Sequence, residues 1–125
     1  MPTTNLTTDL FEETVLGDGI VLVDWWADWC GPCKAFAPIY ESASETNPDI
    51  TFAKIDTEAE QQLSASAGIT SIPTLMAFRE GVLVFAQPGA LPAPALNQVI
   101  EAVRGLDMEE VHKQVAAQAA QQPDA

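Results

Sequence analysis

The chain has 125 residues, of which 47% are hydrophobic, and this length suffices for one hydrophobic core but not for two ordinary domains. Eighteen acidic side chains against five basic ones give a formal net charge of −13, which argues against nucleic acid and anionic membrane surfaces as partners. No apolar run approaches the length of a membrane span, and the N-terminal residues lack the pattern of a signal peptide. We therefore expect a single-domain cytoplasmic protein whose thiols are kept reduced.

The first predicted elements are a short strand, a helix and a long buried strand. The short strand opens at Leu6, and Thr7 or Thr8 followed by Asp9 is typical of a helix N-terminus. This helix should turn inward its apolar residues Leu10, Phe11, Val15 and Leu16. After the glycines of residues 17–19, residues 20–27 are apolar on both faces, which predicts a central strand covered by helices on each side. Asp24 is the exception in that strand.

Two helices, a second buried strand and a hairpin of two strands are predicted next. The helix that starts at the cysteine motif contains Pro38 and ends before Asn47-Pro48-Asp49. A strand over residues 50–56 and a short helix over residues 58–67 follow it. Strands over residues 75–78 and 82–86 are joined by Glu80-Gly81, which is a hairpin signal.

The last third of the chain is predicted to be a loop and two helices. The loop covers residues 87–94, and residues 95–103 have the apolar spacing of an amphipathic helix. Beyond Gly105, Asp107 and Glu110 resemble a capping box, and a narrow apolar stripe follows, formed by Met108, Val111, Val115 and Ala119. Such a thin apolar face predicts a loosely docked helix, and the tail from Gln121 to Ala125 should be frayed.

Both cysteines lie in one motif, Cys30-Gly31-Pro32-Cys33. A disulfide across so small a loop adds little stability, so reversible redox chemistry is the better explanation of the pair. Pro32 suits the first turn of a helix, and a helix N-terminus at Cys30 would favour its thiolate. Two other interpretations remain open, a zinc site and a pair of inert buried cysteines. Structural zinc needs a full tetrahedral ligand set, and the chain offers only His112 besides the cysteines.

Several separated segments together resemble thioredoxin: residues 21–34, Ala37-Pro38, Ala53-Lys54, residues 71–74 and Gly89-Ala90. The resemblance covers roughly residues 5 to 105 in unbroken order. It implies an α/β thioredoxin fold, a single three-layer domain with a central mixed β-sheet flanked by helices. We expect residues 1–105 to form this domain, and residues 106–125 to be an extra C-terminal helix and frayed tail of the same domain.

The expected chemistry is disulfide exchange, in which a thiolate attacks a substrate sulfur and a second thiol releases the mixed disulfide. Cys30 at the helix start is the expected attacker, and Cys33, one turn inside and more buried, the expected resolver. Asp24 in a buried strand should have a raised pKa and could exchange protons near neutrality. The resemblance assigns that role to Asp24, acting on Cys33 through water, with Lys54 as its charge partner.

The resemblance also implies a shallow substrate groove next to the cysteines. Pro73 corresponds to a proline that is cis in this fold, and it would let the backbone of Ile72 pair with an extended substrate segment. The groove would be outlined by Trp29, Gly31, Pro32, Ile72, Pro73, Gly89 and Ala90. Trp25 and Trp26 are expected in the core.

The predicted activity is that of a monomeric protein-disulfide reductase. Gly-Pro between the cysteines offers no polar donor to stabilise the Cys30 thiolate, which favours a reductant over an oxidase or isomerase. The protein should bind no cofactor or metal, and the resemblance implies re-reduction of the Cys30–Cys33 disulfide by a flavoprotein, thioredoxin reductase, with electrons from NADPH. Its other partners would be disulfide-containing proteins. An alternative from another class is a thioredoxin-fold binding module that acts through the C-terminal helix.

Overall fold

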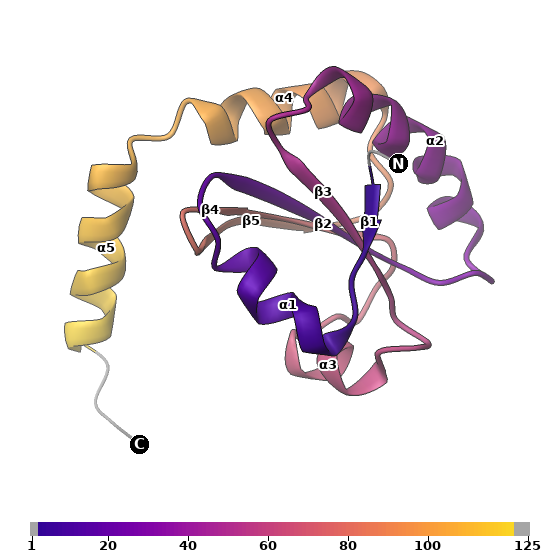
Figure 1. Ribbon diagram of the computed structural model, residues 1–125, viewed down its shortest axis with the longest axis horizontal. Coiled ribbons are helices and arrows are strands. Elements are labelled where there is room, and N and C mark those ends of the chain that lie inside the picture. The colour runs from indigo at the N-terminus through magenta and orange to yellow at the C-terminus, as the bar shows by residue number, and fades with distance from the viewer. Residues whose placement is uncertain (1–2, 122–125) are drawn as a thin grey trace.

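Five strands form one mixed sheet between two helical layers in the computed structural model of the chain, which describes residues 3–121 (Figure 1). The strand order is β1-β3-β2-β4-β5. Strands β1, β2 and β3 are parallel, whereas β4 runs antiparallel to β2 and β5 antiparallel to β4. The strands are β1 (Thr3–Asn5), β2 (Ile20–Trp26), β3 (Thr51–Asp56), β4 (Thr74–Arg79) and β5 (Val82–Pro88). The predicted α/β class and the mixed central sheet are confirmed.

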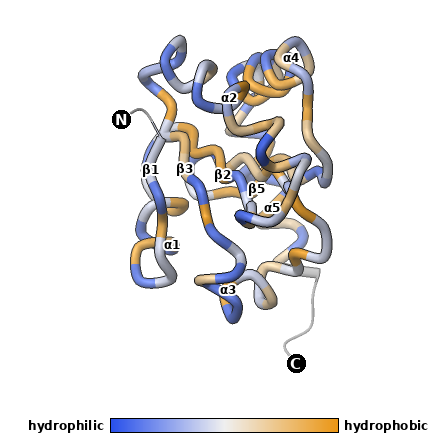
Figure 2. The backbone as a smooth tube through the Cα atoms, turned by 90° about the vertical axis from the view of Figure 1, so that its right-hand side faces the viewer, coloured by the Kyte–Doolittle hydropathy of each residue, from blue (hydrophilic) through white to orange (hydrophobic). Residues whose placement is uncertain are grey.

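Helices cover both faces of the sheet (Figure 1). The helices are α1 (Thr8–Val15), α2 (Gly31–Thr46), α3 (Gln61–Ser66), α4 (Ala93–Arg104) and α5 (Met108–Gln121). One core cluster joins α2 and α4 to the sheet, and a second joins α1 and α3 to the opposite face. Hydrophobic stretches run through the central strands, as Figure 2 shows. None of these helices within residues 3–121 is long and apolar enough to cross a membrane.

Side chains of β2 alternate between the two faces of the sheet, so that each helical layer packs against a different set of them. Val21, Val23 and Trp25 belong to the cluster beneath α1 and α3, whereas Leu22 belongs to the cluster beneath α2 and α4. Because successive side chains of a strand point to opposite faces, Asp24 shares the face of Leu22. The fold therefore places a carboxyl group beneath α2, the helix that begins at the cysteine motif.

The first helix has the predicted start but not the predicted apolar face. Thr7 is the N-cap residue, yet the capping oxygen comes from Glu60, whose Oε1 accepts hydrogen bonds from Thr8 N at 2.8 Å and Thr8 Oγ1 at 3.0 Å. Phe11 and Val15 pack inward as predicted. Leu10 and Leu16 are exposed, so their predicted inward placement is wrong. A helix of eight residues buries only one narrow stripe, and Phe11 and Val15, four residues apart, occupy it.

Several element boundaries differ from those predicted. Strand β1 ends before Leu6, which is buried beside it. Helix α3 starts at Gln61 rather than residue 58, because Asp56 Oδ1 accepts a hydrogen bond from Glu58 N at 2.9 Å in a preceding turn. The hairpin turn at Glu80-Gly81 is confirmed, with φ values of 51° and 78°. The predicted loop over residues 87–94 is shorter, since β5 extends to Pro88 and α4 begins at Ala93.

The C-terminal helix α5 is present and projects from the rest of the fold (Figure 1). Asp107 Oδ1 accepts a hydrogen bond from Glu110 N at 3.3 Å, which is one half of the predicted capping box. Within the predicted stripe Met108 is buried, whereas Val115 is exposed. His112 Nε2 and Glu80 Oε1 are 3.0 Å apart and connect α5 to the hairpin turn. The predicted frayed tail lies outside the described residues, except for Gln121, which ends α5.

The side chain of Arg79 forms hydrogen bonds with the segment that joins α4 to α5. Arg79 Nη1 at the end of β4 donates hydrogen bonds to the backbone oxygens of Val103, Arg104 and Leu106 at 2.8 to 3.1 Å. These carbonyls belong to the last turn of α4 and the residues that follow it, where helix carbonyls lack intrahelical partners. The C-terminal end of α4 is thus capped by charge-assisted hydrogen bonds from Arg79.

Candidate active site

The two cysteines lie at the N-terminus of α2 and are joined by a disulfide. Cys30 is the N-cap residue with an extended backbone, and its Sγ accepts a hydrogen bond from Cys33 N at 3.2 Å. Pro32 lies in the first helical turn, where its missing N–H removes no helical hydrogen bond. The unpaired N–H groups of this turn and the helix dipole favour negative charge on Cys30 Sγ once the disulfide is opened.

Burial does not distinguish the two sulfurs. Cys30 is 4% exposed and Cys33 is 3% exposed, so in this disulfide form the expected greater burial of Cys33 is only a slight difference. Both pack in one cluster with Ala27, against Trp26 and Ile72. Their surroundings do differ: Cys30 Sγ lies 3.7 Å from the backbone oxygen of Ile72, and Cys33 lines a cavity that also reaches Asp24.

The loop before β4 brings Ile72 into contact with the cysteines. The Ile72–Pro73 peptide bond is cis, as the resemblance implied. Gly89 N donates a hydrogen bond of 2.7 Å to Pro73 O, and the φ of Gly89, 104°, is one that other residues rarely adopt. Trp29 is 69% exposed beside Cys30. Gly31, Pro32 and Ala90 are exposed as well, which suits residues that are predicted to meet a substrate.

Asp24 is the buried titratable group of the site. It is 1% exposed, and neither carboxylate oxygen has a hydrogen-bond partner among the described residues. Burial raises the pKa of Asp24 to about 7 from its ordinary 3.8, and the positive charge of Lys54 offsets part of that rise. A carboxyl group with this pKa can both accept and donate a proton at neutral pH.

A cavity of about 80 Å³ connects Asp24 with Cys33. Its lining is made up of Asp24, Trp26, Ala27, Asp28, Cys33, Lys34, Ala37 and Lys54. This volume is large enough for water molecules, and the Asp24 carboxylate in its mainly apolar lining offers them hydrogen-bond acceptors. Cys33 and Asp24 therefore face one small shared cavity.

Lys54 lies beside Asp24 without forming an ion pair with it. The two residues are in register on the parallel strands β3 and β2. Among the ion pairs within the described residues, none joins Lys54 to Asp24 within 4.0 Å. The Lys54 Nζ instead lies over the ring of Trp26, 4.9 Å from the ring centroid. Lys54 thus influences Asp24 through its electric field rather than through a direct bond.

Three further residues belong to this site that the sequence analysis did not assign to it. Trp26 was expected in the core with Trp25, but only Trp25 is fully buried, and Trp26 lines the cavity. Asp28 and Lys34 line the cavity too and are exposed. Two features of the sequence could have indicated these residues. Trp26 follows Asp24 by two residues and therefore shares its face of the strand, and Lys34 directly follows Cys33.

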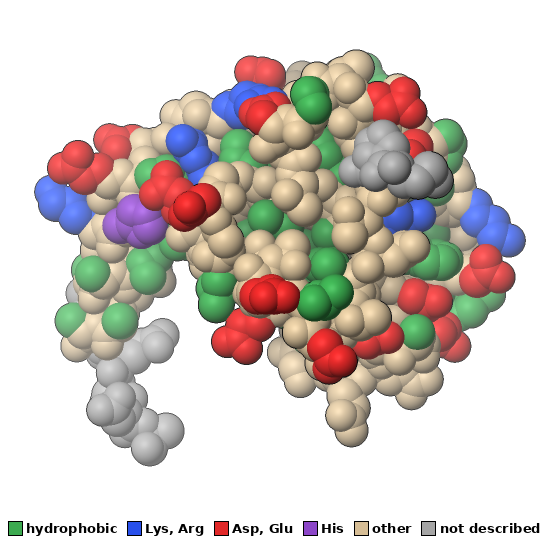
Figure 3. Space-filling model, viewed as in Figure 1, with side chains coloured by type: hydrophobic (Ala, Val, Ile, Leu, Met, Phe, Trp, Pro, Cys, Tyr) green, Lys and Arg blue, Asp and Glu red, His purple; other side chains and the backbone are tan. Residues whose placement is uncertain are grey.

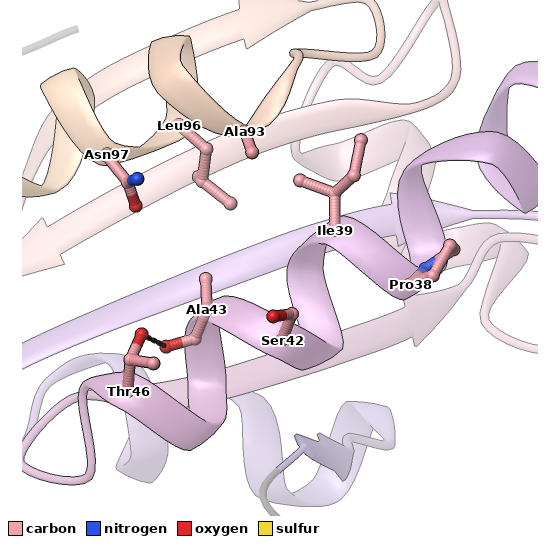
Figure 4. Close-up of a pocket in the computed structure, with 8 residues that line it drawn as sticks. All are labelled: Pro38, Ile39, Ser42, Ala43, Thr46, Ala93, Leu96 and Asn97. Atoms are coloured by element: carbon pink, nitrogen blue, oxygen red, sulfur yellow. Dashed lines mark hydrogen bonds between the residues drawn. The ribbon is translucent and has the colours of Figure 1, made fainter.

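The hollow between α2 and α4 lacks ionisable groups that could carry chemistry. A hollow of about 380 Å³ lies between α2 and α4, as Figure 4 shows, and its lining contains no ionisable side chain. Acidic side chains are spread over the face seen in Figure 3 rather than gathered into one patch. Within residues 3–121, no group of three or more His, Cys, Asp or Glu is arranged to hold a metal ion.

Comparisons with known proteins match the chain to one family over most of its length. The family model described as Thioredoxin matches residues 2–102. A protein of Streptomyces coelicolor that carries the provisional name thioredoxin 2 is 58% identical over 119 residues, which are 95% of this chain and 89% of the relative. Thioredoxin 1 of a Nostoc species is 41% identical over 77% of this chain and 92% of its own. A solved structure of Plasmodium falciparum thioredoxin is 35% identical, covers 79% of this chain and 97% of its own, and has a TM-score of 0.74.

Proposed function

The chain belongs to the thioredoxin family of disulfide oxidoreductases, and on that premise we propose that it reduces disulfide bonds of cytoplasmic proteins through Cys30-Gly31-Pro32-Cys33. The observation that carries the proposal is the Cys30–Cys33 disulfide at the start of α2, connected by a cavity to a buried carboxyl group. Inert buried cysteines would need neither a helix N-terminus nor a titratable neighbour.

The reaction takes place in two exchanges. In the first, the thiolate of reduced Cys30 attacks one sulfur of a client disulfide; a bond forms between Cys30 and the client, and the other client sulfur leaves as a thiolate. In the second, Cys33 loses its proton and attacks Cys30 Sγ. The Cys30–Cys33 disulfide forms, and the remaining client sulfur leaves. The client gains two electrons and two protons, and the protein is oxidised.

Asp24 acts in the second exchange as the base for the Cys33 thiol. The attacking sulfur must be a thiolate, and of the two carboxyl groups that line the cavity beside Cys33, Asp24 is buried whereas Asp28 is exposed. A carboxyl group with a pKa of about 7 is partly ionised at neutral pH and is a stronger base than an ordinary aspartate. Lys54, the proposed charge partner, keeps part of the carboxyl population ionised.

The client lies in the groove outlined by Trp29, Gly31, Pro32, Ile72, Pro73, Gly89 and Ala90. In this proposal the backbone of Ile72, held by the cis peptide before Pro73, pairs with an extended client segment. The exposed ring of Trp29 supplies apolar contact area next to Cys30.

The oxidised protein is returned to its dithiol form by a flavoprotein, thioredoxin reductase, that takes electrons from NADPH. We further propose that the protein is a monomer without a bound cofactor, and that residues 1–105 are the thioredoxin domain with residues 106–125 as its extension. The absence of a polar side chain between the cysteines favours a reductant over an oxidase or isomerase.

Reduction of insulin disulfides driven by dithiothreitol tests the proposed function. The wild type should accelerate insulin precipitation far above the rate with dithiothreitol alone, because the thiolate of Cys30 is favoured by the helix N-terminus. The control is the double variant Cys30→Ser/Cys33→Ser, which should add nothing. Equal rates for wild type and double variant would refute the reductase proposal and favour a binding module.

Replacement of Asp24 by Asn should slow the second exchange about tenfold at pH 7, since the Cys33 thiol loses its base but retains water as a weaker acceptor. Release of a fluorescent peptide from the mixed disulfide in a single turnover measures this step. The rate of the first exchange serves as the internal control and should change little. An unchanged release rate would remove Asp24 from the mechanism.

A further inference from the structure

Lys54 has two neighbours with which its ammonium group can interact. Asp24 lies in register with it on the adjacent strand, and Trp26 follows Asp24 by two residues on the same face of β2. The carboxylate of Asp24 offers a charged acceptor in a buried place, whereas the indole of Trp26 offers its negative ring face. The structure has the ammonium over the indole, 4.9 Å from the ring centroid.

We propose that Trp26 is a positioning residue, whose ring binds the Lys54 ammonium and keeps it from pairing with the Asp24 carboxylate. This inference rests on the role proposed above for Asp24, because it concerns how that carboxyl group stays able to exchange protons. Indole is the most favourable aromatic ring for a cation, and the interaction strengthens where water is excluded. Trp26 is half-buried and lines the same cavity as Lys54 and Asp24.

The unpaired atoms of the site support this arrangement. Both oxygens of Asp24 and the Nε1 of Trp26 are buried without hydrogen-bond partners in the described part of the chain. A lysine in hydrogen-bonding contact with Asp24 would satisfy its carboxylate and strongly favour the ionised form. Held over the indole, the ammonium acts on Asp24 only at a distance, and burial remains the larger influence on the carboxyl group.

The other titratable groups around Asp24 do not replace Lys54 in this role. From α2 come Cys33, Lys34 and Tyr40, and from the residues after β2 comes Asp28. Cys33 is in the disulfide, and Tyr40 is buried with its hydroxyl donating to Ala53 O at 2.7 Å. Lys34 and Asp28 are exposed and of opposite charge. On the other side of β2, strand β4 places the apolar Leu75 opposite Asp24.

The carboxyl ¹³C resonance of Asp24, followed against pH in the oxidised protein, tests the proposal without a client. The resonance is identified by its absence from Asp24→Asn. In Trp26→Leu the freed ammonium should pair with Asp24 and lower its titration midpoint by about half a unit to one unit, the scale of a nearby charge. Trp26→Phe keeps a weaker ring face, so its midpoint should fall between those of wild type and Trp26→Leu.

A double-substitution cycle separates this role from simple packing. Lys54→Met removes the cation and should raise the Asp24 midpoint, and Trp26→Leu added to Lys54→Met should then move it no further. An equal shift from Trp26→Leu with and without Lys54 would overturn the proposal, because Trp26 would then act by burial alone. An Asp24 titration midpoint that is the same in wild type, Trp26→Phe and Trp26→Leu would overturn the proposal as well. Insulin reduction by the same samples keeps this outcome distinct from a failure of the proposed function.

Discussion

Substitution of Asp24 by Asn is expected to stabilise the oxidised protein by about 4 kcal/mol at pH 8 and to change its stability little at pH 4. Burial raises the pKa of Asp24 from 3.8 to about 7. Between these values the folded protein binds a proton that the unfolded chain releases, so the free energy of unfolding falls as pH rises. A shift of about three units, at 1.36 kcal/mol per unit, gives the expected difference. Because Asn stays neutral at every pH, the variant does not lose this free energy of unfolding as pH rises.

Urea unfolding of wild type and variant at pH 4, 6 and 8 measures this effect. The matched control is Asp18→Asn, which changes an exposed carboxyl group in the turn before β2 and should leave the pH dependence of stability unaltered. A gain of equal size at pH 4 and pH 8 would mean that packing, not the buried charge, is responsible. A loss of stability at pH 8 would contradict the raised pKa of Asp24.

Replacement of either cysteine by Ser should reduce insulin turnover to the rate of dithiothreitol alone. The hydroxyl of Ser is far less acidic than a thiol and forms no disulfide, so each variant lacks one of the two exchanges and cannot complete the catalytic cycle. Cys30→Ser lacks the attacking sulfur at the helix N-terminus, whereas Cys33→Ser lacks the sulfur that opens the mixed disulfide. The two losses therefore look alike in steady state, although they arise at different steps.

Two controls make that loss interpretable. Far-ultraviolet circular dichroism of both variants should match the reduced wild type, because the disulfide closes a loop too small to contribute much stability. Lys113→Met, which changes an exposed lysine on α5 outside the site, should retain most of the turnover. Full turnover by Cys30→Ser would disprove the assignment of Cys30 as the attacking residue.

The parts of the fold that were predictable from sequence are those determined by local patterns. Residues 20–26 are apolar on both faces and form the central strand β2, flanked by β3 and β4. The Glu80-Gly81 turn and the start of α2 at the cysteine motif also depend on neighbouring residues only. The cis peptide before Pro73 was predicted from the resemblance and not from a local pattern.

The features that were missed depend on residues distant in sequence. The cap of α1 comes from Glu60, 52 residues away from Thr8, and no local pattern points to it. Leu10 and Leu16 flank Phe11 and Val15 in sequence and were predicted to point inward with them, but both remain exposed in the part of the chain that the structure describes. The contact of Lys54 with Trp26 needs the pairing of β2 with β3 and a choice between two partners. Asp24 could be identified because a lone carboxyl group in an apolar strand is visible in the sequence itself.

The order of the two thiols is tested most directly by intact mass spectrometry of reduced Cys33→Ser mixed with a small disulfide-bonded peptide. The proposed mechanism predicts a stable adduct, one peptide chain per protein, attached at Cys30 and removable by dithiothreitol. Wild type should release the peptide and end with its Cys30–Cys33 disulfide, and Cys30→Ser should form no such adduct at a comparable rate. No adduct on Cys33→Ser, or an equally fast adduct at Cys33 of Cys30→Ser, would contradict attack by Cys30 and release by Cys33.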